Sequence, residues 1–343
     1  MNFFMKGRVK WVDIAKGIAV SLVVYGHFGT SEAAKSVIYA FHIPLFFFLS
    51  GLFFSFDKFP SYKLFLKKRS VQLLIPYLFF NFITYLLWLF IGRKFGSDIS
   101  SNIHPLKPIL GILYGNASNL PHNVPLWFLT CLFSVENLYF FIFRKTSKQQ
   151  HFFLLLIIVA IAFINYKLNH VFRLPWGIDI ALSMLLFYGL GVNLKSEFLE
   201  KNRNKASLSG LLIISFFVVL IIARLNGKIE VSDNYFGNYI YFVLGALAGI
   251  IFIVSLSMLI AQVKLKYSLL SFLGRNSLII FGLHLYAGSF VKTISAFVFH
   301  LPLSIYETPT VSLLLTIFSI VVLLPVVFFI NKYLPFVVGK SRK

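Results

Sequence analysis

Apolar stretches close to twenty residues long recur from one end of this sequence to the other. A helix of about twenty residues, rising about 1.5 Å per residue, is long enough to cross the hydrocarbon core of a bilayer. Hydrophobic residues make up 58% of the 343 positions and charged residues only 13%, which excludes an ordinary water-soluble enzyme. We therefore expect an all-α fold, a polytopic bundle of helices integral to the membrane.

The hydrophobic pattern predicts about ten transmembrane helices. They are expected at residues 12–30, 37–56, 71–92, 124–143, 151–167, 177–194, 207–225, 238–261, 276–298 and 310–331. We find no internal repeat and no soluble domain, so residues 1–343 are interpreted as a single membrane-embedded domain. The first apolar run lacks a small-residue cleavage site, and we expect this span to remain in the mature protein.

The basic residues, which give the chain a formal charge of +21, predict its orientation in the membrane. They gather in alternate connections, at residues 6–10, 58–69, 144–148, 195–205, 264–275 and 332–343. By the positive-inside rule, both termini and the loop around Asn202 should face the cytoplasm. The long connection from His104 to His122 should then lie outside, as a lip over the substrate or as a floppy loop.

The same charge pattern suggests which partners and which location to expect. Short basic clusters between apolar spans favour anionic lipid over nucleic acid as the partner. The cytoplasmic membrane is the expected location. The single cysteine, Cys131, allows neither an intrachain disulfide nor a paired-cysteine metal site, and we expect it to be a small buried residue.

The first predicted span carries three ionisable residues, Asp13, Lys16 and His27. Ionisable side chains are costly inside a membrane, so each is a candidate for function. Lys16 and His27 are eleven residues apart, which places them on nearly the same helical face and about 16 Å apart along the axis. Alternatively, Asp13 only neutralises a snorkelling Lys16. Gly17 and Gly26 would let another helix or a ligand approach closely.

A second histidine, His42, lies early in the next predicted span. Because only a short loop joins the two spans, His42 enters the membrane from the side at which His27 ends. The two histidines are therefore expected to converge. Imidazole is the usual general base near neutral pH, and it can take the proton of a hydroxyl group during acyl transfer.

These residues and their surroundings resemble the acyltransferase-3 family of membrane proteins. Lys16 and His27, with ten residues between them, are similar to the Arg-x10-His signature of that family, with Lys in place of Arg. The segments DIAKG, VVYGH and FHIPLFFFLSG resemble the branch related to fucose 4-O-acetylases, in which Lys at this position is familiar. Further similarities follow in the same order along the chain, at 68–77, 125–129, 174–179, 187–191 and 273–284.

The resemblance implies an O-acyltransferase that moves an acyl group, usually acetyl, from cytoplasmic acyl-CoA to a hydroxyl of a cell-surface glycan or glycolipid. His27 is then the expected general base, and His42 its partner or a residue that positions the acceptor. Lys16 is the expected cation for the donor phosphates, as a point charge where Arg would offer a bidentate fork. Acyl-CoA is a co-substrate, and neither a metal nor a bound cofactor is expected. Other enzymes of envelope polysaccharides are expected partners.

Several other polar residues have either a site role or a structural role. Arg69 and Arg275 stand at cytoplasmic entrances of predicted spans, where they bind donor phosphates or serve as topology signals. Glu136 and His284 lie inside spans and either reach the site or pair with another buried group. Asp179 can orient a histidine or an acceptor hydroxyl.

Trp127, near the outer end of the fourth predicted span, is either a platform for a sugar ring or an aromatic residue of the membrane interface. Two rival functions remain open. Intramembrane His, Lys and Asp also suit a transporter or flippase of a lipid-linked sugar or small acid, although no inverted repeat is detectable. A non-catalytic scaffold would leave the polar cluster of the first two spans without a purpose.

Overall fold

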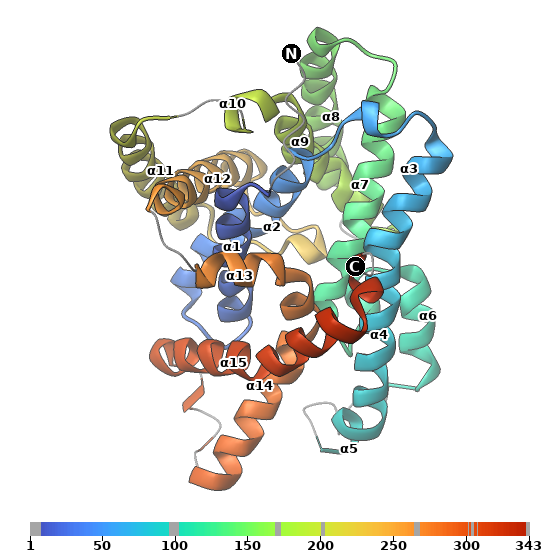
Figure 1. Ribbon diagram of the computed structural model, residues 1–343, viewed down its shortest axis with the longest axis vertical. Coiled ribbons are helices and arrows are strands. Elements are labelled where there is room, and N and C mark those ends of the chain that lie inside the picture. Colours follow the sequence, from blue (N-terminus) through green and yellow to red (C-terminus); the bar gives the residue numbers. More distant parts are fainter. Residues whose placement is uncertain are drawn as a thin grey trace.

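The computed structural model describes residues 8–95, 103–168, 173–199, 203–263 and 268–340, without positions 301, 303, 304 and 307. Within these ranges the protein is helical, and its extended structure is limited to one isolated bridge between Glu230 and Tyr235. The helices gather into one bundle (Figure 1). The all-α fold class predicted from the sequence is confirmed.

Nine helical segments in the described part of the chain are long and apolar enough to cross a membrane. They comprise α2 (Glu32–Gly51), the continuous run of α3 (Tyr62–Arg69), η2 (Ser70–Leu74), α4 (Ile75–Leu87) and η3 (Trp88–Gly92), then α7 (Trp127–Phe143), α8 (Lys148–Leu168), α9 (Ile178–Asn193), α11 (Lys205–Asn226), α12 (Tyr239–Gln262), α14 (Ser277–Phe299) and α15 (Pro309–Tyr333). A further apolar helix, α1 (Lys10–Gly26), has 17 residues and is about 25 Å long. Each of these segments overlaps one predicted span.

Shorter helices form the connections. They are η1 (Phe56–Lys58), α5 (Arg93–Phe95), α6 (Leu106–Tyr114), η5 (Ala117–Asn119), η6 (Val124–Leu126), η7 (Pro175–Gly177), α10 (Lys195–Leu199), η8 (Val231–Asp233), α13 (Leu269–Arg275) and η10 (Pro335–Val338). Asn202 lies outside the described residues. The orientation of the bundle across the membrane therefore stays a prediction from the charge pattern.

The outward faces of several long helices are apolar. Large side chains such as Phe152 on α8, Ile214 on α11 and Phe328 on α15 are more than half exposed. Apolar surface costs about 25 cal/mol per Å² in water, and a soluble monomer rarely exposes it so continuously. These faces fit a bilayer environment, as the composition predicts.

Helix α1 holds a central position, because it packs against α2, α12, α13, α14 and α15. Its contact with the short helix α13 is made backbone to backbone. A Cβ atom at Gly17 would lie 2.0 Å from the carbonyl oxygen of Leu270, and one at Gly274 would lie 1.7 Å from that of Asp13. The approach expected at Gly17 is thus made by another helix of the chain.

Candidate active site

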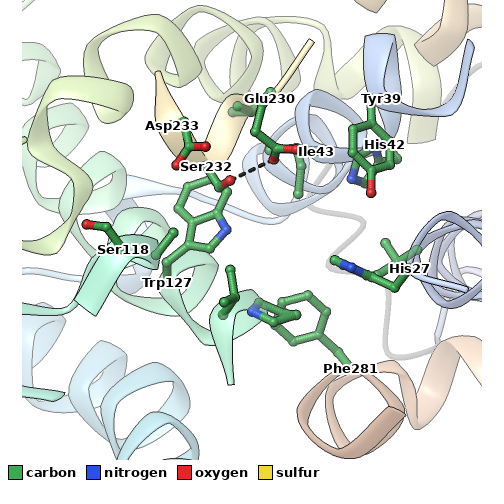
Figure 2. A pocket seen from close by; sticks show the side chains of 15 residues that line it. His27, Tyr39, His42, Ile43, Ser118, Trp127, Glu230, Ser232, Asp233 and Phe281 are labelled. Atoms are coloured by element: carbon green, nitrogen blue, oxygen red, sulfur yellow. Dashed lines mark hydrogen bonds between the residues drawn. The ribbon is translucent and has the colours of Figure 1, made fainter. Parts of the chain in front are cut away.

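A cavity of about 360 Å³ lies where α1 ends (Figure 2). Its polar and aromatic lining comes from four regions far apart in the sequence: the first two helices, the η5–α7 segment, the η8 loop and α14. The lining includes the side chains of His27, Tyr39, His42, Ser118, Trp127, Glu230, Ser232, Asp233 and Phe281. A second cavity of about 300 Å³ shares His27, Tyr39 and Glu230 with the first, so the two adjoin.

His27 stands at the end of α1, where the helix opens towards the cavity. The sequence predicts a span that continues to residue 30, but the helix ends at Gly26 and His27 is its C-terminal cap. The imidazole is exposed to both cavities. Its ring nitrogens have no hydrogen-bond partner within the described part of the chain, so they are free to engage a substrate hydroxyl.

His42 reaches the same cavity from α2 and has a defined tautomer. Its Nδ1 lies 2.8 Å from the carbonyl oxygen of Ile38. A carbonyl only accepts hydrogen bonds, so Nδ1 carries the proton and Nε2 keeps its lone pair. The two histidines that the sequence expects to converge therefore line one cavity.

Tyr39 joins the two histidine-bearing helices. Its ring packs against that of His42 with a centroid distance of 4.9 Å, and its hydroxyl donates to the carbonyl oxygen of Gly26 at 3.2 Å. The close approach expected at Gly26 is made by this ring, because a Cβ there would lie 2.9 Å from it. Tyr39 thus fixes the start of α2 against the end of α1.

His284 of α14 lies directly behind His27. The two ring centroids are 5.1 Å apart, and the His284 side chain is fully buried. Its Nδ1 donates to the carbonyl oxygen of Phe281 at 2.8 Å, while Nε2 has no partner among the described residues. His284 does not line the cavity, but it supports the histidine that does.

The wall opposite His27 is acidic and was missed by the sequence analysis. Glu230 and Asp233 flank Ser232 on the loop before α12, and Figure 2 shows Ser232, Asp233 and Trp127 across the cavity from His27. The Ser232 hydroxyl donates to Glu230 Oε1 at 2.6 Å. Burial raises the pKa of the Glu230 carboxyl above its ordinary value, and the Ser232 hydrogen bond opposes that shift.

Lys16 lies on α1 three turns before His27, half-buried, with its ammonium 5.8 Å from the centre of the Phe53 ring. Asp13 and Arg8 are within electrostatic range. However, no carboxylate among the described residues lies within ion-pairing distance of Lys16, so the Asp13 pairing considered from the sequence does not form. The lysine is left free to bind an anion.

Comparison with known proteins identifies the family. A family model described as an acyltransferase domain matches residues 9–330, nearly the whole chain. The chain belongs to the acyltransferase-3 family. A search of curated proteins and a search of solved structures found no match.

Two further residues of this acyltransferase, Arg69 and Glu136, form a buried ion pair. Arg69 Nε lies 3.0 Å from Glu136 Oε2, and the guanidinium also donates to Gln72 at 2.9 Å. Arg69 ends α3 where the π-helical turn η2 begins, and its side chain reaches Glu136 on α7. Neither residue lines the cavity. Glu136 thus has the structural partner that the sequence left unnamed, and Arg69 is not a free cation.

Arg275 closes α13 and is exposed. It belongs to a basic group with Arg8 and Lys340, because burial and then the charges of Arg8 and Arg275 lower the pKa of the Lys340 ammonium. Lys340 donates to Asn331, which donates in turn to Asn276. This group lies near the Lys16 end of α1, since Arg8 acts on both lysines.

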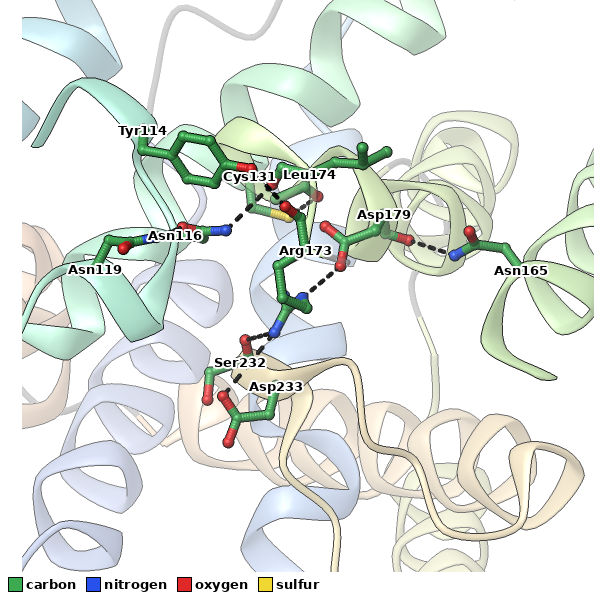
Figure 3. A network of polar contacts seen from close by, with 11 residues as sticks. Tyr114, Asn116, Asn119, Cys131, Asn165, Arg173, Leu174, Asp179, Ser232 and Asp233 are labelled. Carbon is green, nitrogen blue, oxygen red and sulfur yellow. Dashed lines mark hydrogen bonds and ion pairs between the residues drawn. The ribbon is translucent and has the colours of Figure 1, made fainter. Parts of the chain in front are cut away.

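Asp179, expected to orient a histidine or an acceptor hydroxyl, is instead paired with Arg173 (Figure 3). Arg173 Nε donates to Asp179 Oδ2 at 2.6 Å, and Arg173 Nη1 donates to the carbonyl oxygen of Ser232 at 2.8 Å. The Asp179 side chain is fully buried. The pair therefore acts on the site indirectly, by holding the loop that carries Glu230 and Asp233.

Trp127 begins α7 and does line the cavity, as a sugar platform would. Cys131, one helical turn further along, is buried as expected. Among the described residues, no group of three His, Cys, Asp or Glu side chains is arranged to hold a metal ion.

Proposed function

We propose that this acyltransferase moves an acyl group, in the simplest case acetyl, from cytoplasmic acyl-CoA to a hydroxyl of a cell-surface glycan or glycolipid. The observation that supports the proposal best is the placement of His27. Its ring stands free at the surface of a cavity large enough for a sugar ring, next to His42 and backed by His284. The unpaired Lys16 lies on the same helix, about 16 Å away.

His27 acts as the general base in this mechanism. It takes the proton of the acceptor hydroxyl, whose oxygen attacks the carbonyl carbon of the thioester. The new carbon–oxygen bond forms as the carbon–sulfur bond breaks, and the proton passes from His27 to the departing CoA thiolate. No covalent enzyme intermediate is required, because the site brings the two substrates together.

The neighbouring residues support this step in different ways. His42 keeps the lone pair of Nε2 and accepts a hydrogen bond from a second acceptor hydroxyl. Lys16 holds a donor phosphate, and the pantetheine arm runs along α1 towards His27. The exposed Arg275 is the second cation of this donor region. Trp127 offers an apolar face to the sugar ring.

A thioester assay on the purified full-length protein tests the proposal. Wild-type protein in lipid nanodiscs is incubated with acetyl-CoA, and the free thiol of CoA is measured with and without a glycan extract as acceptor. Acceptor-dependent thiol release supports acyl transfer. A transporter, a flippase or a scaffold would leave the thioester intact, which would overturn the proposal. Mass spectrometry of surface glycans from strains with and without the protein then identifies the acylated sugar.

A further inference from the structure

The chemistry of the cavity wall constrains which acceptors can enter. Glu230 and Asp233 line the same cavity as His27, and Figure 2 shows Asp233 on the side opposite His27. Neither Lys nor Arg is among the residues that line this cavity. The two lysines nearby, Lys35 and Lys228, line only the adjoining second cavity. Arg173 lies outside this lining, but its Nη1 is 3.9 Å from Asp233 Oδ1. The inner space therefore has hydrogen-bond acceptors and acidic groups, and no Lys or Arg lines it to bind an anionic group.

The acidic wall, formed by Glu230 and Asp233, lies on a loop that backbone hydrogen bonds hold in shape. Glu230 and Tyr235 exchange two backbone hydrogen bonds, of 2.8 and 3.0 Å, which close the loop into a tight turn. Asn234, within this turn, has a positive φ of 55°. A loop tied in this way holds its side chains in place before a ligand arrives.

Arg173 ties the same loop to the body of the protein. Its guanidinium bridges the buried Asp179 and the backbone carbonyl of Ser232 (Figure 3). The Arg173 backbone is held in turn, because the Tyr114 hydroxyl donates to its carbonyl oxygen at 2.6 Å. The position of the acidic wall thus follows from a network that reaches from α6 to α9.

Carboxyl groups fixed in this way suit a particular kind of ligand. An ionised carboxylate accepts hydrogen bonds from hydroxyl groups, and two neighbouring carboxylates can hold a vicinal pair of hydroxyls. They repel a carboxylate or phosphate, because like charges are screened less in a partly desolvated cavity than in water.

We propose that Glu230 and Asp233 form the acceptor subsite and restrict it to a polyhydroxylated ring that is uncharged or cationic. The inference rests on the proposed function and specifies its substrate class. The restriction applies to the ring that receives the acyl group, because the adjoining cavity is also lined by Lys228 and by Lys35, which is paired with Glu32 at 2.8 Å.

Small probe acceptors of matched shape test the restriction without knowledge of the natural sugar. Glycerol, glycerate and (2,3-dihydroxypropyl)trimethylammonium share a vicinal diol and differ in charge. CoA release from acetyl-CoA and the mass of the acylated product are measured for each, with water as background. For wild-type protein we expect kcat/KM for glycerate to be on the order of tenfold or more below that for glycerol, the loss expected when a charged contact becomes unfavourable. The cationic probe should equal or exceed glycerol.

The double variant Glu230→Gln, Asp233→Asn keeps the shape of the wall and removes both charges. In this variant the kcat/KM values for the three probes should become similar. The KM for glycerol should rise, and the KM for acetyl-CoA should stay unchanged. Asp57→Asn is the matched control, because it removes an exposed carboxylate of η1 that does not line either cavity. Thermal unfolding of all variants shows whether each one is folded.

The outcomes separate the inference from the function on which it rests. Equal use of glycerate and glycerol by wild-type protein would overturn the charge restriction while acyl transfer stands. The assignment of the subsite to Glu230 and Asp233 would also be overturned if the double variant folds and ranks the three probes by kcat/KM as wild-type protein does. The selectivity would then come from other residues. CoA release with the glycan extract but with none of the probes would overturn the inference alone. CoA release with neither the extract nor the probes would overturn the proposed function and the inference together.

Discussion

The two ends of α1 present opposite chemistry. At one end His27 faces an open cavity whose far wall is acidic, and at the other Lys16 is half-buried near Arg8, Arg275 and Lys340. The first environment suits a neutral hydroxyl compound, and the second suits phosphates. About 16 Å of one helix thus separates the two kinds of environment that the proposed function requires.

The protein also contains two buried ion pairs, which differ in what they support. Arg173 and Asp179 hold the loop of the acidic wall, whereas Arg69 and Glu136 join α3 to α7 away from the cavity. Both carboxylates are almost completely buried. An ionisable residue in a membrane span is therefore not by itself a sign of catalysis, because its function depends on its partner.

The largest expected effect is on the His27 side. We expect His27→Ala to reduce acyl transfer by about 10²- to 10⁴-fold, the usual effect of losing a general base. Stability should change little, because the ring is exposed to the cavity. Steady-state CoA release and thermal unfolding are the measurements, and His104→Ala, in an exposed loop position, is the matched control. Full activity of the His27→Ala protein would move the base elsewhere, with His42 as the next candidate.

The ion pair behind the acidic wall should have the next largest effect. Arg173→Ala leaves the buried Asp179 carboxylate without its partner, and breaking a buried pair in this way costs roughly 3–5 kcal/mol. Thermal unfolding in nanodiscs measures the loss. Adding Asp179→Asn to the variant should recover much of it, because the unpaired charge is removed. A single variant as stable as wild type would show that the pair does not hold the loop.

A smaller effect is expected at the Lys16 end. Lys16→Ala should weaken acyl-CoA binding by on the order of ten- to a hundredfold, since hydrogen bonds to charged groups contribute roughly 1.5–3 kcal/mol. Lys16→Arg should retain much of the activity because it keeps the charge. Donor titration at saturating acceptor measures the change, and the acceptor KM should stay constant. If a folded Lys16→Ala protein binds donor normally, the exposed Arg275 is the next residue to examine.

The smallest effect on the protein is expected from single cysteine substitutions that test its orientation in the membrane. The orientation decides which end of α1 faces the cytoplasm. Single cysteines replace Lys107, in the predicted outer loop, and Lys145, in a predicted cytoplasmic loop; both lysines are exposed. The native Cys131 is buried and should not react. An impermeant maleimide added to intact cells should label position 107 and not 145. The reverse pattern, or labelling of a cysteine at Asn202 from outside, would contradict the predicted topology.

The sequence predicts the fold well because a single physical requirement dominates it. A segment must have about twenty apolar residues to cross a membrane, and that length can be counted directly. The convergence of His27 and His42 was also predictable, because a short loop leaves their helices few alternatives. Trp127 reaches the cavity for a similar reason, since it begins a helix on the same predicted side.

The remaining site residues depend on contacts that residue types do not specify. The cost of burying a charge identifies Asp179 and Glu136 as notable, but it does not identify Arg173 and Arg69 as their partners. Glu230 and Asp233 lie in a loop, where a carboxylate is ordinary and gives no such signal. Only the packing of that loop over the end of α1 brings them opposite His27.

The hydrogen bond between His42 and Ile38 has a consequence for spectroscopy. It assigns the proton to Nδ1 and so leaves Nε2 as a bare pyridine-like nitrogen. In ¹⁵N magnetic resonance such a nitrogen resonates far from its protonated neighbour, and the signal moves when a hydroxyl donates to it. In a protein labelled only in its histidines, the ¹⁵N signal of His42 Nε2 therefore reports whether an acceptor is bound. This signal can be followed without turnover.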